Sequence, residues 1–222
     1  RAGCIVPDSV LRSIEFDNLE KSIAYRFRER SLLVEAITHA SRPASGVPCY
    51  QRLEFVGDAV LDHLITRHLF FSYTDLPPGR LTDLRAAAVN NENFARVAVK
   101  HGLHKHLRHG SSALERQVGK DGNGISGALF CHVLSIKNFL QIHDFVKDIT
   151  LELDKPGVNS FGLGDFKAPK VLGDIVESIA GAIFLDNGLC ADDIWQVFHI
   201  VLKVILAFCK HLCFISLRIF NS

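Results

Sequence analysis

Two apolar stretches, far apart in the chain, each contain a pair of acidic residues at helical spacing. In residues 50–64, Glu54 and Asp58 lie four positions apart among leucine, valine and phenylalanine. In residues 171–185, Asp174 and Glu177 lie three positions apart among isoleucine, valine and alanine. Residues at these spacings share one face of a helix, so each stretch predicts an apolar helix with both acids on one side. Because a buried carboxylate is costly without a cation or hydrogen bonds, these acids need a partner.

A glycine directly precedes the aspartate in both stretches, at Gly57 and Gly173. Glycine inside a helix costs about 1 kcal/mol relative to alanine, so these glycines indicate that another group approaches the backbone closely. If the two helices meet, they form a cluster of four carboxylates, from Glu54, Asp58, Asp174 and Glu177. Mg²⁺ suits such a site, because it binds a few carboxylates, keeps waters and bridges to phosphate. The pattern therefore indicates metal-assisted phosphoryl transfer.

The chain resembles the ribonuclease III family over residues 51–61, which read Gln-Arg-Leu-Glu-Phe-Val-Gly-Asp-Ala-Val-Leu. Residues 76–85 (Leu-Pro-Pro-Gly-Arg-Leu-Thr-Asp-Leu-Arg) and 167–174 (Lys-Ala-Pro-Lys-Val-Leu-Gly-Asp) are similar to one branch, the second, C-terminal ribonuclease III domain of plant Dicer-like proteins. The resemblance covers most of residues 1–118 and 142–197. Many bacterial members carry Glu at the position of Gln51, whereas the Dicer-like domains also tolerate Gln there.

The resemblance implies an all-α, ribonuclease III-type helical bundle, and the absence of long strand-like alternation favours the same fold. It also implies an endoribonuclease that hydrolyses double-stranded RNA with Mg²⁺, for which Mn²⁺ is an expected substitute. Family members work as paired domains, so the expected partner is a second ribonuclease III domain, in a homodimer or in a larger parent protein. By the same resemblance the catalytic residues are the metal-binding Glu54, Asp58, Asp174 and Glu177, together with Lys170.

Lys170 lies four residues before Asp174 and therefore on the acid face of the same predicted helix. In the resembled domains a lysine at this position assists at the cleavage site. A cation beside several acids can neutralise charge on a phosphate. A plain salt bridge is the competing interpretation.

Two other functions stay open. One is a catalytically idle ribonuclease III-like module that serves in dimerisation or RNA docking; the intact acids argue against it. The more distant one is a dimetal carboxylate oxidoreductase, a class of bundle that expects Glu-x-x-His pairs on facing helices. Gly57 and Ala180 stand three positions after Glu54 and Glu177, so this signal is missing.

The charge of the chain is nearly balanced, with a net value of +1 over 222 residues. This balance excludes a general polyanion binder, so any nucleic-acid surface has to be local. Residues 80–110 carry six basic and two acidic residues, which gives this region a net charge of +4. We expect contacts with an RNA backbone here, with a solvated helical face as the alternative for each residue. The six residues are Arg80, Arg85, Arg96, Lys100, Lys105 and Arg108.

The spacing of apolar residues predicts helices over about residues 18–27, 31–40, 49–71, 80–89 and 168–186. Ser31 is the expected N-cap of the second of these helices, and the polar run beginning at Asn90 is the expected start of another.

We interpret residues 1–197 as one ribonuclease III domain that is interrupted at residues 119–141, a glycine-rich and then apolar segment unlike the family. This segment is translated intron sequence or another gene-model artefact, or else a surface insertion, which the fold would tolerate. The first interpretation is wrong if abundant mature messenger RNA encodes residues 119–141. Residues 198–222 form a divergent apolar tail, which we interpret as a second read-through.

The chain begins with Arg and contains no Met, so we expect it to be a fragment of a larger protein. We expect no membrane helix, because Lys203, Lys210 and Arg218 interrupt the tail and no charge-free span of about 18 residues exists. The six cysteines form no Cys-x-x-Cys pair, which favours a reducing compartment, the nucleus or the cytoplasm.

Overall fold

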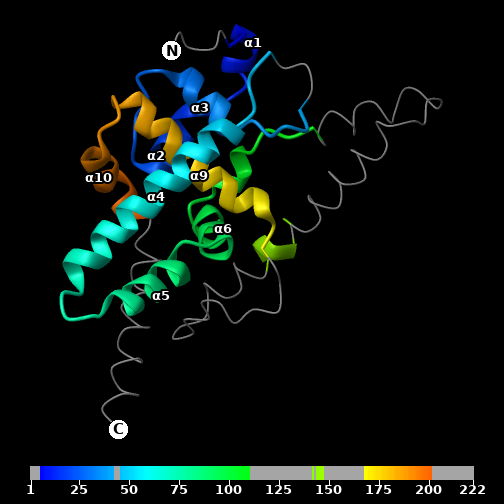
Figure 1. The fold of residues 1–222 in the computed structure, drawn as a ribbon. Coiled ribbons are helices and arrows are strands. Elements are labelled where there is room, and N and C mark those ends of the chain that lie inside the picture. Colours follow the sequence, from blue (N-terminus) through cyan, green and yellow to red (C-terminus); the bar gives the residue numbers. More distant parts are fainter. Residues whose placement is uncertain (1–5, 43–45, 111–141, 143, 148–167, 202–222) are drawn as a thin grey trace.

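The computed structural model describes residues 6–42, 46–110, 142, 144–147 and 168–201, and in these residues it contains helices and no extended strand. The all-α prediction is confirmed. The predicted insertion 119–141 and residues 202–222 of the predicted tail lie outside the described residues. The helices, drawn in Figure 1, are α1 (Asp8–Leu11), α2 (Phe16–Ile23), α3 (Arg30–Ala36), α4 (Gln51–Ser72), α5 (Pro78–Ala88), α6 (Asn91–Lys100), the 3₁₀ helix η1 (Leu103–His106), α9 (Lys170–Asp186) and α10 (Ala191–Val201).

Helix α9 lies at the centre of the bundle, where it packs against α3, α4 and α6. Helix α9 is buried on nearly every side, as expected for a helix that is hydrophobic all round. Ile175, Val176 and Ile183 have no exposed surface. Helix α4 crosses α9, while α5 and α10 pack against α4 (Figure 1). The two acid-bearing helices are therefore direct neighbours in the core.

Two glycines allow α4 and α9 to approach each other more closely than side chains would permit. A Cβ atom on Gly57 would lie 1.7 Å from the carbonyl oxygen of Glu177, and one on Gly181 would lie 2.2 Å from that of Leu53. Both distances are far inside van der Waals contact, so only glycine fits at the crossing. The prediction of a close approach at Gly57 is confirmed.

Several predicted helix boundaries differ from the observed ones. Helix α2 ends at Ile23 because Ala24 adopts a left-handed conformation with φ of 55°. Ser31 is not an N-cap: α3 begins one residue earlier, and the Ser31 hydroxyl donates to the Glu29 carboxylate at 2.7 Å. The predicted start at Asn90 is correct, since its side-chain oxygen accepts a hydrogen bond from the Asn93 amide at 2.9 Å.

A short parallel bridge joins Thr38 to Arg108 and explains why α3 stops before residue 40. The amide of Arg108 donates to the carbonyl of Ile37 at 2.7 Å, and the amide of His39 donates to the carbonyl of Arg108 at 2.8 Å. The amide of Tyr50 then donates to the Thr38 carbonyl at 2.9 Å, just before α4 begins. These bonds tie the segment after α3 both to the chain beyond η1 and to the start of α4.

Within the described residues, no helix is both long enough and apolar enough to cross a membrane.

Candidate functional site

Three of the four predicted acids meet where α4 crosses α9. Glu54 lies on the first turn of α4, and Asp174 and Glu177 lie on consecutive turns of α9. One carboxylate oxygen from each of them lies within 4.8 Å of the other two. Residues 54 and 174 are distant in sequence, so this cluster is produced by the glycine-lined helix crossing and not by either helix alone.

Asp58, the fourth predicted acid, lies one helical turn after Glu54 and is exposed to solvent. It does not belong to the group of oxygens that lie within 4.8 Å of one another. Its negative charge nevertheless contributes to the raised pKa of Glu177, so it lies close enough to act on the cluster electrostatically. The structure therefore places Asp58 at the edge of the site.

Lys170 links the two helices through their acids. Its ammonium nitrogen lies 2.7 Å from Oε1 of Glu54 and 2.6 Å from Oδ1 of Asp174. Burial acts to lower the pKa of Lys170, but the hydrogen bonds to Asp174 and Glu54 raise it above its ordinary value. The lysine side chain is 73% exposed, so the ammonium group that is bonded to both helices faces solvent.

Tyr50 is a site residue that sequence reasoning missed. Its buried hydroxyl donates to Oδ2 of Asp174 at 2.9 Å, while Oδ1 of the same carboxylate accepts from Lys170. Burial and the negative charge of Asp174 raise the pKa of Tyr50, which keeps the hydroxyl protonated and able to donate. The available signal was its position four residues before Glu54, on the acid face of the same helix.

Glu177 carries the clearest sign of crowded negative charge. Burial raises its pKa to about 7, and the charges of Asp58, Asp174 and Glu54 act in the same direction. Burial also raises the pKa of Asp174, although hydrogen bonds from Lys170 and Tyr50 oppose that shift. A bound cation would relieve this repulsion, because it would stabilise the ionised form of each carboxylate.

The donor set fits a small divalent cation. Mg²⁺ prefers carboxylate oxygens and waters, and the cluster offers oxygens from Glu54, Asp174 and Glu177 beside the solvent-exposed Lys170. The cluster contains no histidine, which a dimetal carboxylate oxidoreductase of the Glu-x-x-His type would need. The fit is therefore to a hard cation held by oxygen ligands.

The six predicted RNA-contacting residues have different surroundings. Arg80 and Arg85 form ion pairs with Asp83 at 3.8 Å and with Asp62 at 3.6 Å. Arg96 is buried and paired with Glu92 at 2.7 Å, which argues against it as an RNA contact. Lys100 is exposed at the end of α6. Lys105 and Arg108 line a separate pocket.

Residues 51–188 match the family model described as Ribonuclease III domain. The chain is 66% identical over 198 residues to endoribonuclease Dicer homolog 1 of Arabidopsis thaliana and 66% identical over 194 residues to that of Oryza sativa subsp. japonica. These alignments cover 89% and 87% of this chain, but only 9% of the length of each relative. Endoribonuclease Dcr-1 of Drosophila melanogaster is 43% identical over 82% of this chain and 8% of its own length.

Two solved structures of the nuclease domain of ribonuclease III from Campylobacter jejuni have similar folds. They align with TM-scores of 0.52 and 0.51, both at 26% sequence identity. Each alignment covers 89% of this chain, together with 97% and 95% of the respective bacterial chain. The first is described as showing structural flexibility in a region involved in dimer formation.

Proposed function

This chain belongs to the ribonuclease III family, and from that premise we propose that it hydrolyses phosphodiester bonds of double-stranded RNA, as the endonuclease domain of a Dicer-type protein. The observation that carries the proposal is the convergence of Glu54, Asp174 and Glu177, whose oxygens lie within 4.8 Å of one another. A partly buried cluster of neighbouring carboxylates is costly to maintain unless cations offset its charge.

In this proposal Glu54, Asp174 and Glu177 hold Mg²⁺, with Mn²⁺ as a substitute. A bound divalent cation supplies Lewis-acid stabilisation of phosphoryl oxygens and lowers the pKa of a bound water. Asp58 contributes negative charge at the edge of the site, on the side of Glu177.

Lys170 and Tyr50 have separate roles around these acids. The ammonium group of Lys170 is the solvent-facing cation of the site, so it can offer positive charge to a phosphate that approaches the acids. Tyr50 holds one oxygen of Asp174 in place and thereby sets the direction in which the other oxygen points.

A second ribonuclease III domain is the proposed partner. Phe55, next to Glu54, is 80% exposed and so offers a large apolar side chain to a partner beside the acid cluster. We propose that the face of α4 that bears Phe55 packs against the partner domain. Each domain of the pair would then cut one strand of the duplex.

The catalytically idle module is the less favoured alternative, because Glu54, Asp174 and Glu177 are present and brought together. A module used only for docking would have no need for three neighbouring carboxylates and a lysine at their rim. The presence of this arrangement favours catalysis.

The test is cleavage of an end-labelled RNA duplex by the purified chain, with Mg²⁺ or with EDTA. We expect cuts that require Mg²⁺ and that disappear in the Glu54→Gln/Asp174→Asn variant. Asp75→Asn, which changes an exposed acid in the loop after α4, is the matched control and should cut normally.

If the folded chain does not cut alone, the first ribonuclease III domain of a Dicer-type protein is added as a partner. If cleavage appears only in this mixture, the chain is a nuclease that requires a partner domain, and the proposal is supported. A folded chain that binds Mg²⁺ and yet cuts neither alone nor in the mixture would favour the idle module.

A further inference from the structure

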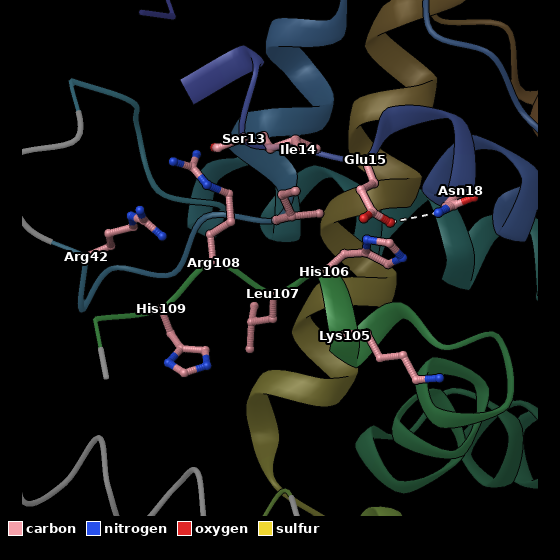
Figure 2. Close-up of a pocket in the computed structure, with 11 residues that line it drawn as sticks. Ser13, Ile14, Glu15, Asn18, Arg42, Lys105, His106, Leu107, Arg108 and His109 are labelled. Carbon is pink, nitrogen blue, oxygen red and sulfur yellow. Dashed lines mark hydrogen bonds between the residues drawn. The ribbon is translucent and has the colours of Figure 1, made fainter. Parts of the chain in front are cut away.

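A pocket lies away from the acid cluster, between the segment before and within α2 and the chain that follows α6. It has a volume of about 680 Å³, which is in the range of sites for small organic ligands. Figure 2 shows its lining side chains, which come from residues 13–15 and Asn18, from Ile37 and Arg42, and from residues 105–109. None of the acids proposed to hold a metal lines this pocket.

Positive charge dominates the lining. Arg42, Lys105 and Arg108 are opposed by one acid, Glu15, and His106 and His109 also line the pocket. The carboxylate of Glu15 accepts a hydrogen bond from Asn18 at 2.7 Å, and Figure 2 shows this pair beside His106, apart from the two arginines. The arginine side of the pocket is therefore suited to an anion.

Arg108 supplies the strongest single indication of a missing ligand. Its side chain is buried, with 8% of the residue exposed, and one guanidinium nitrogen donates to the Thr38 hydroxyl at 3.0 Å. The other terminal nitrogen, Nη2, is buried and has no hydrogen-bond partner among the described residues. Burial and the nearby charge of Arg42 lower the pKa of Arg108 to about 10, so the guanidinium still carries its charge at neutral pH.

A buried, charged donor without a partner is costly, and an anion in the pocket would offset that cost through its charge, and through a hydrogen bond once the guanidinium turns toward it. Guanidinium groups bind phosphate and carboxylate oxygens through paired hydrogen bonds, and several neighbouring cations favour the more highly charged phosphate. We propose that this pocket binds a nucleotide-sized ligand, with the phosphate group held by Arg42 and Arg108 and with Lys105 reaching the same ligand from the other side of the pocket. The ligand is a free nucleotide or the end of an RNA strand.

The pocket can be tested separately from nuclease activity. In EDTA the acid cluster keeps its negative charge and repels phosphate, whereas the pocket needs no metal. The experiment is isothermal titration calorimetry of the full chain in EDTA with uridine 5′-monophosphate, inorganic pyrophosphate and uridine. We expect saturable binding of both phosphate-bearing probes and no binding of uridine.

Arg42→Gln and Lys105→Gln are the informative variants, because these side chains are less buried than Arg108 and can be changed without disturbing the bridge to Thr38. Each should weaken uridine 5′-monophosphate binding by at least about tenfold, as expected for loss of a charged hydrogen bond. Arg26→Gln, at an exposed position after α2 and outside the pocket lining, is the matched control and should bind normally.

Two RNA hexamers, with a 5′-phosphate or a 5′-hydroxyl, identify the source of the phosphate. Tighter binding of the phosphorylated hexamer than of uridine 5′-monophosphate assigns the pocket to an RNA end, and the reverse order assigns it to a free nucleotide. The proposal is overturned if no phosphate-bearing probe binds saturably, or if binding is unchanged in both Arg42→Gln and Lys105→Gln. Failure of RNA cleavage would leave these results unaffected.

Discussion

The hydroxyl of Tyr50 donates a hydrogen bond to Oδ2 of Asp174 at 2.9 Å, which joins the start of α4 to the acid-bearing face of α9. Because Lys170 occupies the other oxygen of Asp174, the orientation of this carboxylate is fixed from both sides. The same tyrosine donates its amide hydrogen to Thr38. Tyr50 therefore connects the framework of the bundle to the site.

Tyr50→Phe tests this role. We expect a loss of about 1 kcal/mol in the free energy of unfolding from the missing hydrogen bond. We also expect kcat for RNA cleavage to fall by about tenfold or more with little change in KM, since Asp174 loses its fixed orientation. Tyr25→Phe is the matched control, because its hydroxyl donates to Asp186 at 2.7 Å, at the far end of α9. Equal kcat losses in both variants would contradict a role specific to Tyr50.

Gly57→Ala should be strongly destabilising. The added Cβ would lie 1.7 Å from the Glu177 carbonyl oxygen, so α4 and α9 would have to separate. We expect a loss of about 1–3 kcal/mol or more in urea unfolding, as for other overpacked cores. Gly79→Ala is the control: its Cβ would meet nothing within 4 Å, so the change should be neutral or stabilising by up to about 1 kcal/mol. Similar unfolding free energies for the two variants would show that the helices do not cross this closely.

Lys170→Gln should separate metal binding from catalysis. The lysine ammonium group is bonded to Glu54 and Asp174, so its removal leaves the site more negative. We expect tighter Mg²⁺ binding by calorimetry but slower cleavage of duplex RNA, because the cation that faces the phosphate is lost. Lys21→Gln, at an exposed position of α2, should change neither measurement. If Lys170→Gln cleaves at the normal rate, Lys170 only forms a structural salt bridge and has no role in catalysis.

The stability of the metal-free protein should depend on pH through Glu177. Burial and neighbouring acids raise its pKa to about 7 from an ordinary value of 4.5. The folded state therefore binds this proton more tightly than the unfolded state, so in EDTA the free energy of unfolding should fall as pH rises from about 4.5 to about 7.

Glu177→Gln should flatten this decline, and Asp75→Asn should not. Thermal melts across that pH range in EDTA provide the measurement, and Mg²⁺ should restore stability at the upper end. A free energy of unfolding that falls as steeply with pH in Glu177→Gln as in the wild type would contradict the assignment.

Phe55→Ser should weaken pairing with a second ribonuclease III domain. The side chain is 80% exposed beside Glu54, so its removal costs the free chain little but takes apolar contact away from a partner. Sedimentation velocity should show less association than in the wild type. Phe71→Ser is the matched control, since Phe71 is 72% exposed at the other end of α4 and should leave association intact. Identical sedimentation of both variants and the wild type would place the partner elsewhere.

The sequence alone determined the helical class, the two acid-bearing helices and their glycines, because these depend on residue spacing along one element. Glu54, Asp174, Glu177 and Lys170 could be named for the same reason, and the family resemblance supported them. Local geometry was less well predicted: Ser31 does not cap α3, and α2 stops at a left-handed Ala24, since these details depend on contacts made by the surrounding chain.

Only the tertiary structure decided which charges meet. In the folded chain Asp58 lies at the edge of the acid cluster, and Tyr50 donates a hydrogen bond to Asp174. Arg96 is buried and paired with Glu92, although it belongs to a region that is basic in sequence. The fold also gathers Arg42, Lys105 and Arg108 around one pocket. Electrostatic energies depend on distance and burial, and neither is fixed by spacing along the chain when the partners lie on different elements.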